Sequence, residues 1–259
     1  MTCLFVKNFM LEHSPVTVSL PQLLPQLEAD GYAVLDAVTV AQWAQHPLPE
    51  LAALAPDWEG MPEDAYLKDG GHYRLRRHAC FVYENKQLTL APRRAHWQSL
   101  SYNALHGGMQ RWFEPMHAHT IEQPVWIDLL SAFARTADSL RRSTHPTGAV
   151  TRWCIEAHQF RIDTKAGIGR PTPEGAHRDG VDLVGVFMIN RQHVKGGETR
   201  VFDAMGTSGQ RFTLSESWSL LLLDDARVIH ETTPIQPAQP GGYRDTLVLT
   251  CRANSFQGE

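Results

Sequence analysis

Three residues in the C-terminal half of the chain have the types and spacing of a mononuclear metal site. His177 and Asp179 form a His-x-Asp pair, and His230 follows 53 residues after His177. Residues two apart in a strand point to the same face, so a strand would present the first two side chains together. Two imidazoles and one carboxylate form the facial triad that holds Fe(II) and leaves coordination positions open. The alternative for each histidine is a buried imidazole satisfied by hydrogen bonds.

A cation follows the distal histidine at the start of an apolar segment. Arg244 lies 14 residues after His230 and opens the run Arg-Asp-Thr-Leu-Val-Leu-Thr. A planar guanidinium suits two-point binding of a carboxylate, and Thr246 on the same strand face could add a hydroxyl. This order predicts a metal that shares its pocket with a carboxylate-bearing co-substrate. The alternative on the same barrel is a cupin-type dioxygenase or isomerase, which usually relies on three or four histidines and needs no such co-substrate.

Further polar residues are candidates for the walls of the pocket. Residues 158–162 alternate, so His158, Phe160 and Ile162 share one face of a strand while Gln159 and Arg161 share the other. The pattern leaves open which face lines the interior, and Gln159 and Arg161 are candidates for binding the co-substrate or metal-bound water. Asn190 ends the strand that follows the metal motif and is a further candidate, although strand-end asparagines commonly feed a turn.

A basic segment, Tyr-Arg-Leu-Arg-Arg at residues 73–77, is the candidate for binding substrate. Arg74 and Arg76 share a face if the segment is a strand. A small zwitterion in a closed pocket needs a cation for its carboxylate, because an unpaired buried charge is costly. The alternative is an exposed edge strand whose charges prevent aggregation.

The secondary structure expected around these residues changes along the chain. Apolar spacing broken by prolines predicts helices in residues 1–70, with a short strand at 31–35, and residues 124–142 form an amphipathic helix. After residue 150, turn signals separate short strands at 153–162, 181–189, 198–202, 217–223, 228–231 and 245–251. We therefore predict a mainly β protein with α-helices, a double-stranded β-helix or jelly-roll barrel. One domain spans residues 1–259, with a helical part at 1–70 and a barrel core at 71–252.

Composition excludes several classes of protein. The chain is 42% hydrophobic and 20% charged with a net charge of −4, which is typical of a soluble globular protein and unsuited to nucleic acid. It has no run of 18 apolar residues, and its N-terminus lacks the features of a signal peptide, so we expect neither a membrane span nor secretion. Four scattered cysteines, Cys3, Cys80, Cys154 and Cys251, predict no disulfide framework and suit the cytoplasm.

Longer motifs resemble a known family. The His-x-Asp pair, the distal histidine and the arginine after it resemble the 2-oxoglutarate/Fe(II) dioxygenases. Residues 102–115, 173–182 and 196–202 resemble more narrowly the bacterial free-amino-acid hydroxylases of the isoleucine dioxygenase group, which includes a biofilm, stress and motility protein. The resemblance covers about residues 70–252. Arg178 stands where these relatives have an uncharged residue, a difference that bears on the substrate rather than on the metal.

The resemblance implies a jelly-roll fold, Fe(II) held by His177, Asp179 and His230, and 2-oxoglutarate anchored by Arg244. It implies hydroxylation of a free aliphatic L-amino acid or similar small molecule, with release of succinate and CO2. A protein from another class, a non-catalytic or regulatory sensor of a small molecule, remains the alternative, because an intact triad demonstrates only competence to bind metal.

Overall fold

The computed structural model of the protein describes residues 13–145, 147 and 150–259. Cys3 and the first twelve residues, to which the signal-peptide prediction applies, lie outside the described residues. The described helices are α1 (Leu20–Asp30), α2 (Ala37–Ala44), α3 (Leu48–Ala52), the 3-10 helix η1 (Ala55–Trp58), α4 (Ala118–Ile121) and α5 (Pro124–Thr144). None of them is long and apolar enough to cross a membrane.

The N-terminal helices begin and end at residues whose chemistry explains the boundary. Helix α1 ends at Gly31, which takes the left-handed conformation (φ 75°) that glycine adopts without steric cost. Strand β1 (Tyr32–Leu35) follows at once. Asp36 then begins α2, because its carboxylate accepts the N–H of Thr39 at 2.7 Å.

The strands form three sheets among the described residues. Seven lie antiparallel in the order β1-β9-β5-β12-β4-β2-β3, three in the order β10-β7-β8, and two pair as β11-β6. The remaining bounds are β2 (Arg74–Glu84), β3 (Gln87–Leu90), β4 (Trp153–Asp163), β5 (Leu183–Gln192), β6 (Val194–Gly196), β7 (Thr199–Asp203), β8 (Gly209–Phe212), β9 (Leu220–Asp224), β10 (Val228–Thr232), β11 (Ile235–Pro237) and β12 (Tyr243–Ala253).

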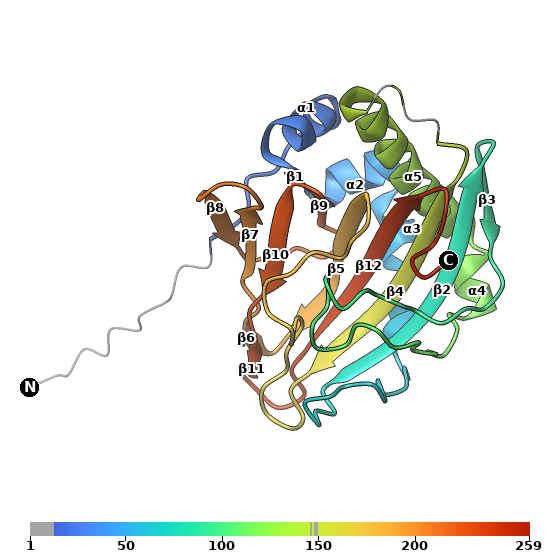
Figure 1. The fold of residues 1–259 in the computed structure, drawn as a ribbon. Coiled ribbons are helices and arrows are strands. Elements are labelled where there is room, and N and C mark those ends of the chain that lie inside the picture. The colour runs from blue at the N-terminus through green and yellow to red at the C-terminus, as the bar shows by residue number, and fades with distance from the viewer. Residues whose placement is uncertain (1–12, 146, 148–149) are drawn as a thin grey trace, which may run out of the picture.

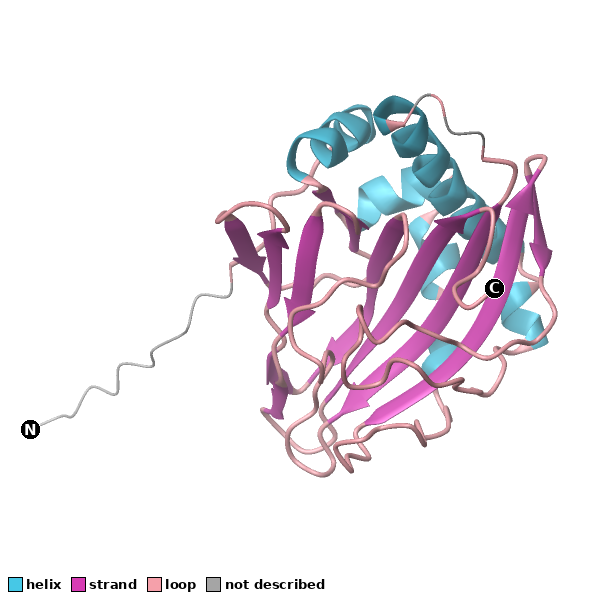
Figure 2. Ribbon diagram, viewed as in Figure 1, coloured by secondary structure: helices cyan, strands magenta, loops and turns pink. Residues whose placement is uncertain are grey.

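The large sheet has a different cover on each face. Figures 1 and 2 show helices packed behind it, while the smaller sheets and long loops lie in front. The helix-covered face holds the main hydrophobic core, in which Trp126 and Phe133 of α5 pack with Phe187 and Leu249 of the sheet. A second core joins the sheets, with Val184 and Met188 on one side and Val201 and Phe212 on the other. Burial of both cores from water stabilises the two-layer arrangement.

The predicted fold class is confirmed: antiparallel strands dominate, helices flank them, and the sheets enclose a jelly-roll-like space. The expected strands and the helix at 124–142 are present with bounds that differ by a few residues. Short strands β3, β6, β8 and β11 and helix α4 were not predicted, because their short and largely exposed segments carry little hydrophobic periodicity.

Candidate active site

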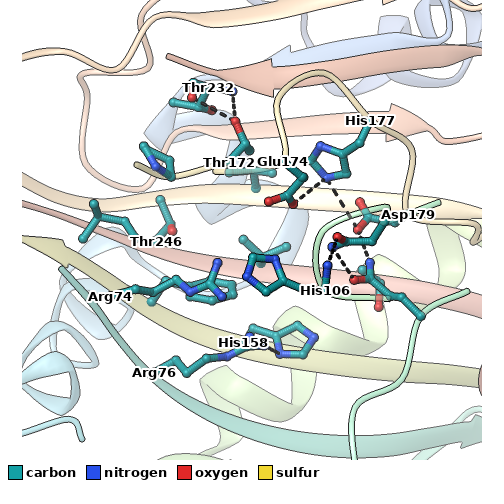
Figure 3. Close-up of a pocket in the computed structure, with 18 of the residues that line it drawn as sticks. Arg74, Arg76, His106, His158, Thr172, Glu174, His177, Asp179, Thr232 and Thr246 are labelled. Carbon is teal, nitrogen blue, oxygen red and sulfur yellow. Dashed lines mark hydrogen bonds and ion pairs between the residues drawn. The ribbon is translucent and has the colours of Figure 1, made fainter. Parts of the chain in front are cut away.

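A cavity of about 850 Å³, counted with its mouth to solvent, lies in front of the large sheet. Strands β2, β4, β5 and β12 form its floor, β10 lines one side, and residues 96–111 and 171–179 contribute loops to its walls. Figure 3 shows side chains from these elements pointing into it.

The three predicted metal ligands meet at this cavity. His177 and His230 face each other across an isolated antiparallel bridge, in which the N–H of each donates to the carbonyl of the other at 3.0 and 2.9 Å. Asp179 Oδ1 lies 3.9 Å from His177 Nε2, and Asp179 Oδ2 lies 3.6 Å from His230 Nε2. One ligand atom from each residue lies within 4.8 Å of the other two. A strand was expected to carry both His177 and Asp179, but Asp179 lies in a loop.

The surroundings of the imidazoles prepare them to bind metal. His177 Nδ1 donates to the carbonyl of Gly175 at 2.9 Å, so Nε2 is the nitrogen that faces the cluster. Burial, followed by the positive charge of His177, lowers the pKa of His230 to about 3, so this ring is neutral. Burial lowers the pKa of His177, but the carboxylates of Asp179 and Glu174 outweigh it and the net shift is upward. Two imidazole nitrogens and a carboxylate oxygen fit Fe(II).

Asp225 holds the loop that carries Asp179. It is fully buried just beyond β9, and its carboxylate accepts the backbone N–H groups of Asp179, Gly180 and Val181 at 2.8, 2.7 and 3.1 Å. Arg178 donates to the carbonyl of Asp225 at 2.7 Å and is not among the residues that line the cavity.

Two glutamines complete the support of the acidic ligand. Gln98 Nε2 donates to Asp179 Oδ1 at 3.0 Å, and Gln257 Nε2 donates to the carbonyls of Asp179 and Gly180 at 2.6 and 2.8 Å. The C-terminal segment and the loop near residue 98 therefore both constrain Asp179.

Arg244 offers a buried guanidinium to the cavity. Its Nε and Nη2 atoms are buried without a hydrogen-bond partner, and no acidic side chain of the described residues forms an ion pair with it. Burial, with the nearby charge of Arg191, lowers its pKa to about 9. Thr246 lines the cavity on the same face of β12. Unsatisfied buried donors of this kind fit a carboxylate of 2-oxoglutarate.

Strand register explains why the basic segment reaches the same cavity. Arg74, Ile162 and Arg244 lie opposite one another across β2, β4 and β12, and they share one face of the sheet. Arg76, Phe160 and Thr246 form the next row. The structure thus brings Arg74 and Arg76 together with Arg244, and all three line the cavity.

Asp64 balances part of this positive charge. Its Oδ2 lies 2.8 Å from Arg74 Nε and 3.5 Å from Arg76 Nη1. Arg76 also lies over the ring of Phe113, 3.6 Å from its centroid. One buried carboxylate therefore serves two guanidiniums, and Arg74 Nη2 and Arg76 Nε have no hydrogen-bond partner.

The predictions for Gln159 and Arg161 are corrected by the packing of β4. His158 and Phe160 line the cavity, so Gln159 and Arg161 lie on the opposite, helix-covered face. Arg161 there binds Asp245 at 2.8 Å and Glu59, just after η1, at 2.8 Å. The alternation was right, but only the packing of the N-terminal segment decides which face is inside.

The prediction for Asn190 is corrected by an irregularity in β5. Met188 pairs with Thr246, whereas Asn190 pairs with Asp245, so the strand gains one residue at this point. A bulge reverses the direction of the side chains that follow it. Asn190 is therefore directed away from the cavity, and its amide donates to the Tyr243 hydroxyl at 3.0 Å.

Four buried residues at the floor of the cavity were not singled out as a group from the sequence. Glu156 Oε2 lies 2.6 Å from His96 Nδ1, 3.0 Å from His78 Nε2 and 3.7 Å from His158 Nε2. These residue types could hold a metal. However, His158 Nδ1 accepts from Arg76 Nη2 at 2.8 Å, so its proton is on Nε2, which is not free to bind a metal. The cluster instead fixes the orientation of Arg76.

Other cavity residues missed by sequence reasoning come from the loops. Gln98, Asn103, His106, Arg111 and Glu174 all line the cavity. Most belong to residues 96–111, a segment with no periodic pattern, although the 102–115 and 173–182 motifs contain four of the five. Burial, followed by the charge of Arg74, lowers the pKa of His106 to about 4, so this ring is neutral.

Several solved structures are similar to this chain over most of its length. Among solved structures, a bsmA homologue from Methylobium petroleophilum PM1 is 50% identical, with a TM-score of 0.87 over 95% of this chain and 97% of that chain. IDO from Bacillus thuringiensis is 17% identical, with a TM-score of 0.71 over 93% and 99%. The Fe(II)/α-ketoglutarate-dependent dioxygenase TqaL is 15% identical, with a TM-score of 0.67 over 92% and 88%. No curated protein sequence matches the chain.

The 2OG-Fe dioxygenase family model matches residues 55–250, which include the metal ligands, Arg244 and the basic segment of β2. The match spans most of the chain, and the donor set of the cavity suits the metal and the co-substrate of that family. The chain belongs to the 2OG-Fe dioxygenase family and is a non-haem iron enzyme that uses Fe(II) and 2-oxoglutarate.

Proposed function

We propose that this dioxygenase hydroxylates a free aliphatic L-amino acid or a close derivative, with His177, Asp179 and His230 as the Fe(II) ligands. The observation that carries the substrate class is the pair Arg74 and Arg76, whose buried guanidiniums line the cavity that contains the metal ligands. Each keeps a nitrogen without a hydrogen-bond partner. A substrate carboxylate would satisfy both.

Arg244 and Thr246 bind 2-oxoglutarate in this proposal. Arg244 supplies paired donors to the carboxylate remote from the metal, and Thr246 supplies a hydroxyl from the same strand face. With Fe(II) and 2-oxoglutarate bound, O2 would be the oxidant: one of its oxygen atoms would enter the succinate that forms, with CO2, from 2-oxoglutarate, and the other would become the hydroxyl placed on an unactivated carbon. The protein supplies position and an enclosed site, as cofactor enzymes generally do.

Apolar residues between the charged groups suit an aliphatic side chain. Phe160 and Ile162 of β4, Val186 of β5 and Val248 of β12 line the cavity. A hydrophobic wall binds methylene groups but offers no partner to a polar side chain. The combination of cations and apolar surface favours a small carboxylate with a hydrocarbon part.

We also propose that the chain forms one domain and that the protein is located in the cytoplasm. Helices α1, α2 and α5 share a single hydrophobic core with the large sheet, which supports one folding unit for the part of the chain that the structure describes. Cys80, Cys154 and Cys251 are buried free thiols, which suits a reducing compartment.

The test is substrate-stimulated succinate formation with a panel of free L-amino acids. We expect leucine, isoleucine or methionine to stimulate turnover. Arg74→Ala and Arg76→Ala should each raise the apparent KM for the amino acid about 10-fold or more, since a hydrogen-bonded charge is lost. Arg77→Ala is the matched control, because Arg77 donates to the carbonyl of Pro115 and does not line the cavity.

Two outcomes would contradict the proposal. If no free amino acid stimulates succinate formation, the substrate class is wrong and the iron assignment stands. If Arg74→Ala and Arg76→Ala keep the wild-type KM, or behave as Arg77→Ala does, these residues do not bind the substrate.

A further inference from the structure

Glu174 is a mostly buried acid in the wall of the cavity, and the iron and 2-oxoglutarate assignments leave it without a role. It precedes His177 by three residues, and its side chain is 13% exposed. Its Oε2 atom is buried and has no hydrogen-bond partner. Figure 3 shows its carboxylate directed into the cavity beside His177. A buried carboxylate is costly unless a cation or hydrogen-bond donors neutralise it.

His177 cannot neutralise the Glu174 carboxylate when His177 binds the metal. Glu174 Oε1 lies 3.6 Å from His177 Nε2, which is too long for a hydrogen bond. When Nε2 of His177 binds the metal, the one proton of the ring is on Nδ1, where it is donated to the carbonyl of Gly175, so Nε2 has no hydrogen to offer. Glu174 is also not among the three residues whose ligand atoms lie within 4.8 Å of one another.

The remaining charges of the cavity show what is missing. Arg74 and Arg76 enter from β2, and Arg111 enters from the loop that precedes α4. Asp64 neutralises part of this charge at one end, and Arg111 Nη2 is held by Gln98 Oε1 at 2.9 Å. Glu174 stands on a different wall from Arg74 and Arg76 (Figure 3). The cavity therefore presents Arg74 and Arg76 at one place and the carboxylate of Glu174 at another, with the metal ligands beside Glu174.

We infer that Glu174 binds the ammonium group of an α-amino acid substrate while the arginines bind its carboxylate. The inference deepens the proposed function and rests on it. A zwitterion carries both charges that this cavity leaves unpaired, and its side chain then lies along the apolar wall. Glu174 also determines specificity, because a carboxylic acid without the amine would leave this carboxylate buried and unpaired.

The experiment compares each amino acid with the same molecule lacking its amine. The twenty protein L-amino acids are titrated by calorimetry into enzyme loaded with Mn²⁺ and 2-oxoglutarate. Each amino acid that binds is compared with its des-amino acid, such as 4-methylpentanoate for leucine. The wild type should prefer the amino acid by about 10-fold to 100-fold, the range expected for a hydrogen bond between charged groups.

Glu174→Gln should abolish this preference by weakening amino-acid binding about 10-fold to 100-fold while leaving the des-amino acid unchanged. Glu174→Asp keeps the charge and should retain part of the preference. Glu122→Gln, at an exposed position outside the cavity, should behave as the wild type. The affinities of each variant for Mn²⁺ and 2-oxoglutarate are measured first. If Glu174→Gln binds either of them more weakly than the wild type does, the test uses Glu174→Asp instead, and the quantity compared is its preference for the amino acid over the des-amino acid.

The outcomes separate this inference from the proposed function. If amino acids bind and Glu174→Gln keeps the wild-type preference, or weakens both ligands equally, Glu174 does not bind the ammonium and the proposed function survives. If Glu174→Asp is the deciding variant, an undiminished preference overturns the inference. If none of the twenty amino acids binds the wild type, both fail together.

Discussion

The carboxylate of Asp225 accepts the backbone N–H of Asp179 at 2.8 Å, so one buried acid positions the acidic metal ligand. The same carboxylate accepts the N–H groups of Gly180 and Val181. His230 is held in strand β10, and His177 is bridged to it through the backbone, but Asp179 lies in a loop. The position of the third ligand therefore depends on Asp225 rather than on the sheet.

The first prediction concerns Asp225→Asn. The amide keeps one acceptor oxygen and places an NH2 group against backbone donors, so the 179–181 loop loses part of its support. We expect Mn²⁺ affinity to fall about 10-fold to 100-fold, the usual effect of removing a group that orients a metal ligand. Calorimetric titration of Mn²⁺ measures it.

The control for this prediction is Asp203→Asn. Asp203 Oδ1 also accepts two backbone N–H groups, those of Met205 and Gly206, but in an exposed turn outside the cavity. Equal metal affinities for Asp225→Asn and the wild type would show that the loop holds its shape without Asp225.

Much of the site follows from local patterns in the sequence. Residues two apart share a strand face, which places Arg74 with Arg76 and Arg244 with Thr246 on the cavity side. The His-x-Asp pair and the distal histidine were found by residue type and spacing alone, and the structure places their ligand atoms together. Such inferences succeed because strand alternation is fixed by backbone geometry.

The rest depends on contacts between segments far apart in the chain. Asn190 was misplaced because a bulge in β5 shifts the alternation by one residue. Gln159 was placed on the wrong face of β4. Alternation does not decide which face of the strand is turned to the cavity; Glu59, just after η1, packs against the face that carries Gln159 and Arg161. Asp225 and Glu156 act through loops and neighbouring strands, and no periodic pattern marks such residues.

The second prediction concerns metal and stability. Binding of a metal to the folded state alone raises the free energy of unfolding, by about 2.7 kcal/mol when free metal is 100 times its dissociation constant. Mn²⁺ should therefore raise the melting temperature of the wild type, and EDTA should reverse the rise. Asp179→Ala should abolish the rise, whereas His72→Ala, at an exposed side chain, should keep it. A full Mn²⁺-dependent rise in Asp179→Ala would remove Asp179 from the ligand set.

The third prediction concerns Arg244. Arg244→Ala should raise the 2-oxoglutarate concentration needed for half-maximal succinate formation by about 30-fold or more, since truncating one partner of a buried charge pair costs at least about 2 kcal/mol. Arg244→Lys keeps the charge but loses two-point contact, so its effect should lie between the wild type and Arg244→Ala. Mn²⁺ affinity should be unchanged in both. Loss of metal affinity in parallel with 2-oxoglutarate would mean that Arg244 supports the whole cavity instead.

The last prediction concerns the buried histidines around Glu156. Burial is the main cause that lowers the pKa of His96 to about 4; Glu156 opposes the shift, and Arg111 and Arg76 add to it. In the unfolded chain the same histidine has a pKa near 6.5. Between about pH 4 and pH 6.5 the unfolded state therefore holds a proton that the folded state does not, and stability rises with pH in this window.

The contribution of His96 is about 1.4 kcal/mol per pH unit, and it disappears above about pH 6.5, where the ring is neutral in both states. Urea unfolding of the metal-free protein at intervals from pH 4.5 to 6 measures the slope. His96→Gln should reduce that slope by about this amount, because glutamine binds no proton in either state. Comparing slopes rather than absolute stabilities removes the packing cost of the substitution. An unchanged slope would mean that His96 takes up its proton equally in both states, so that burial does not keep the ring neutral in the folded protein.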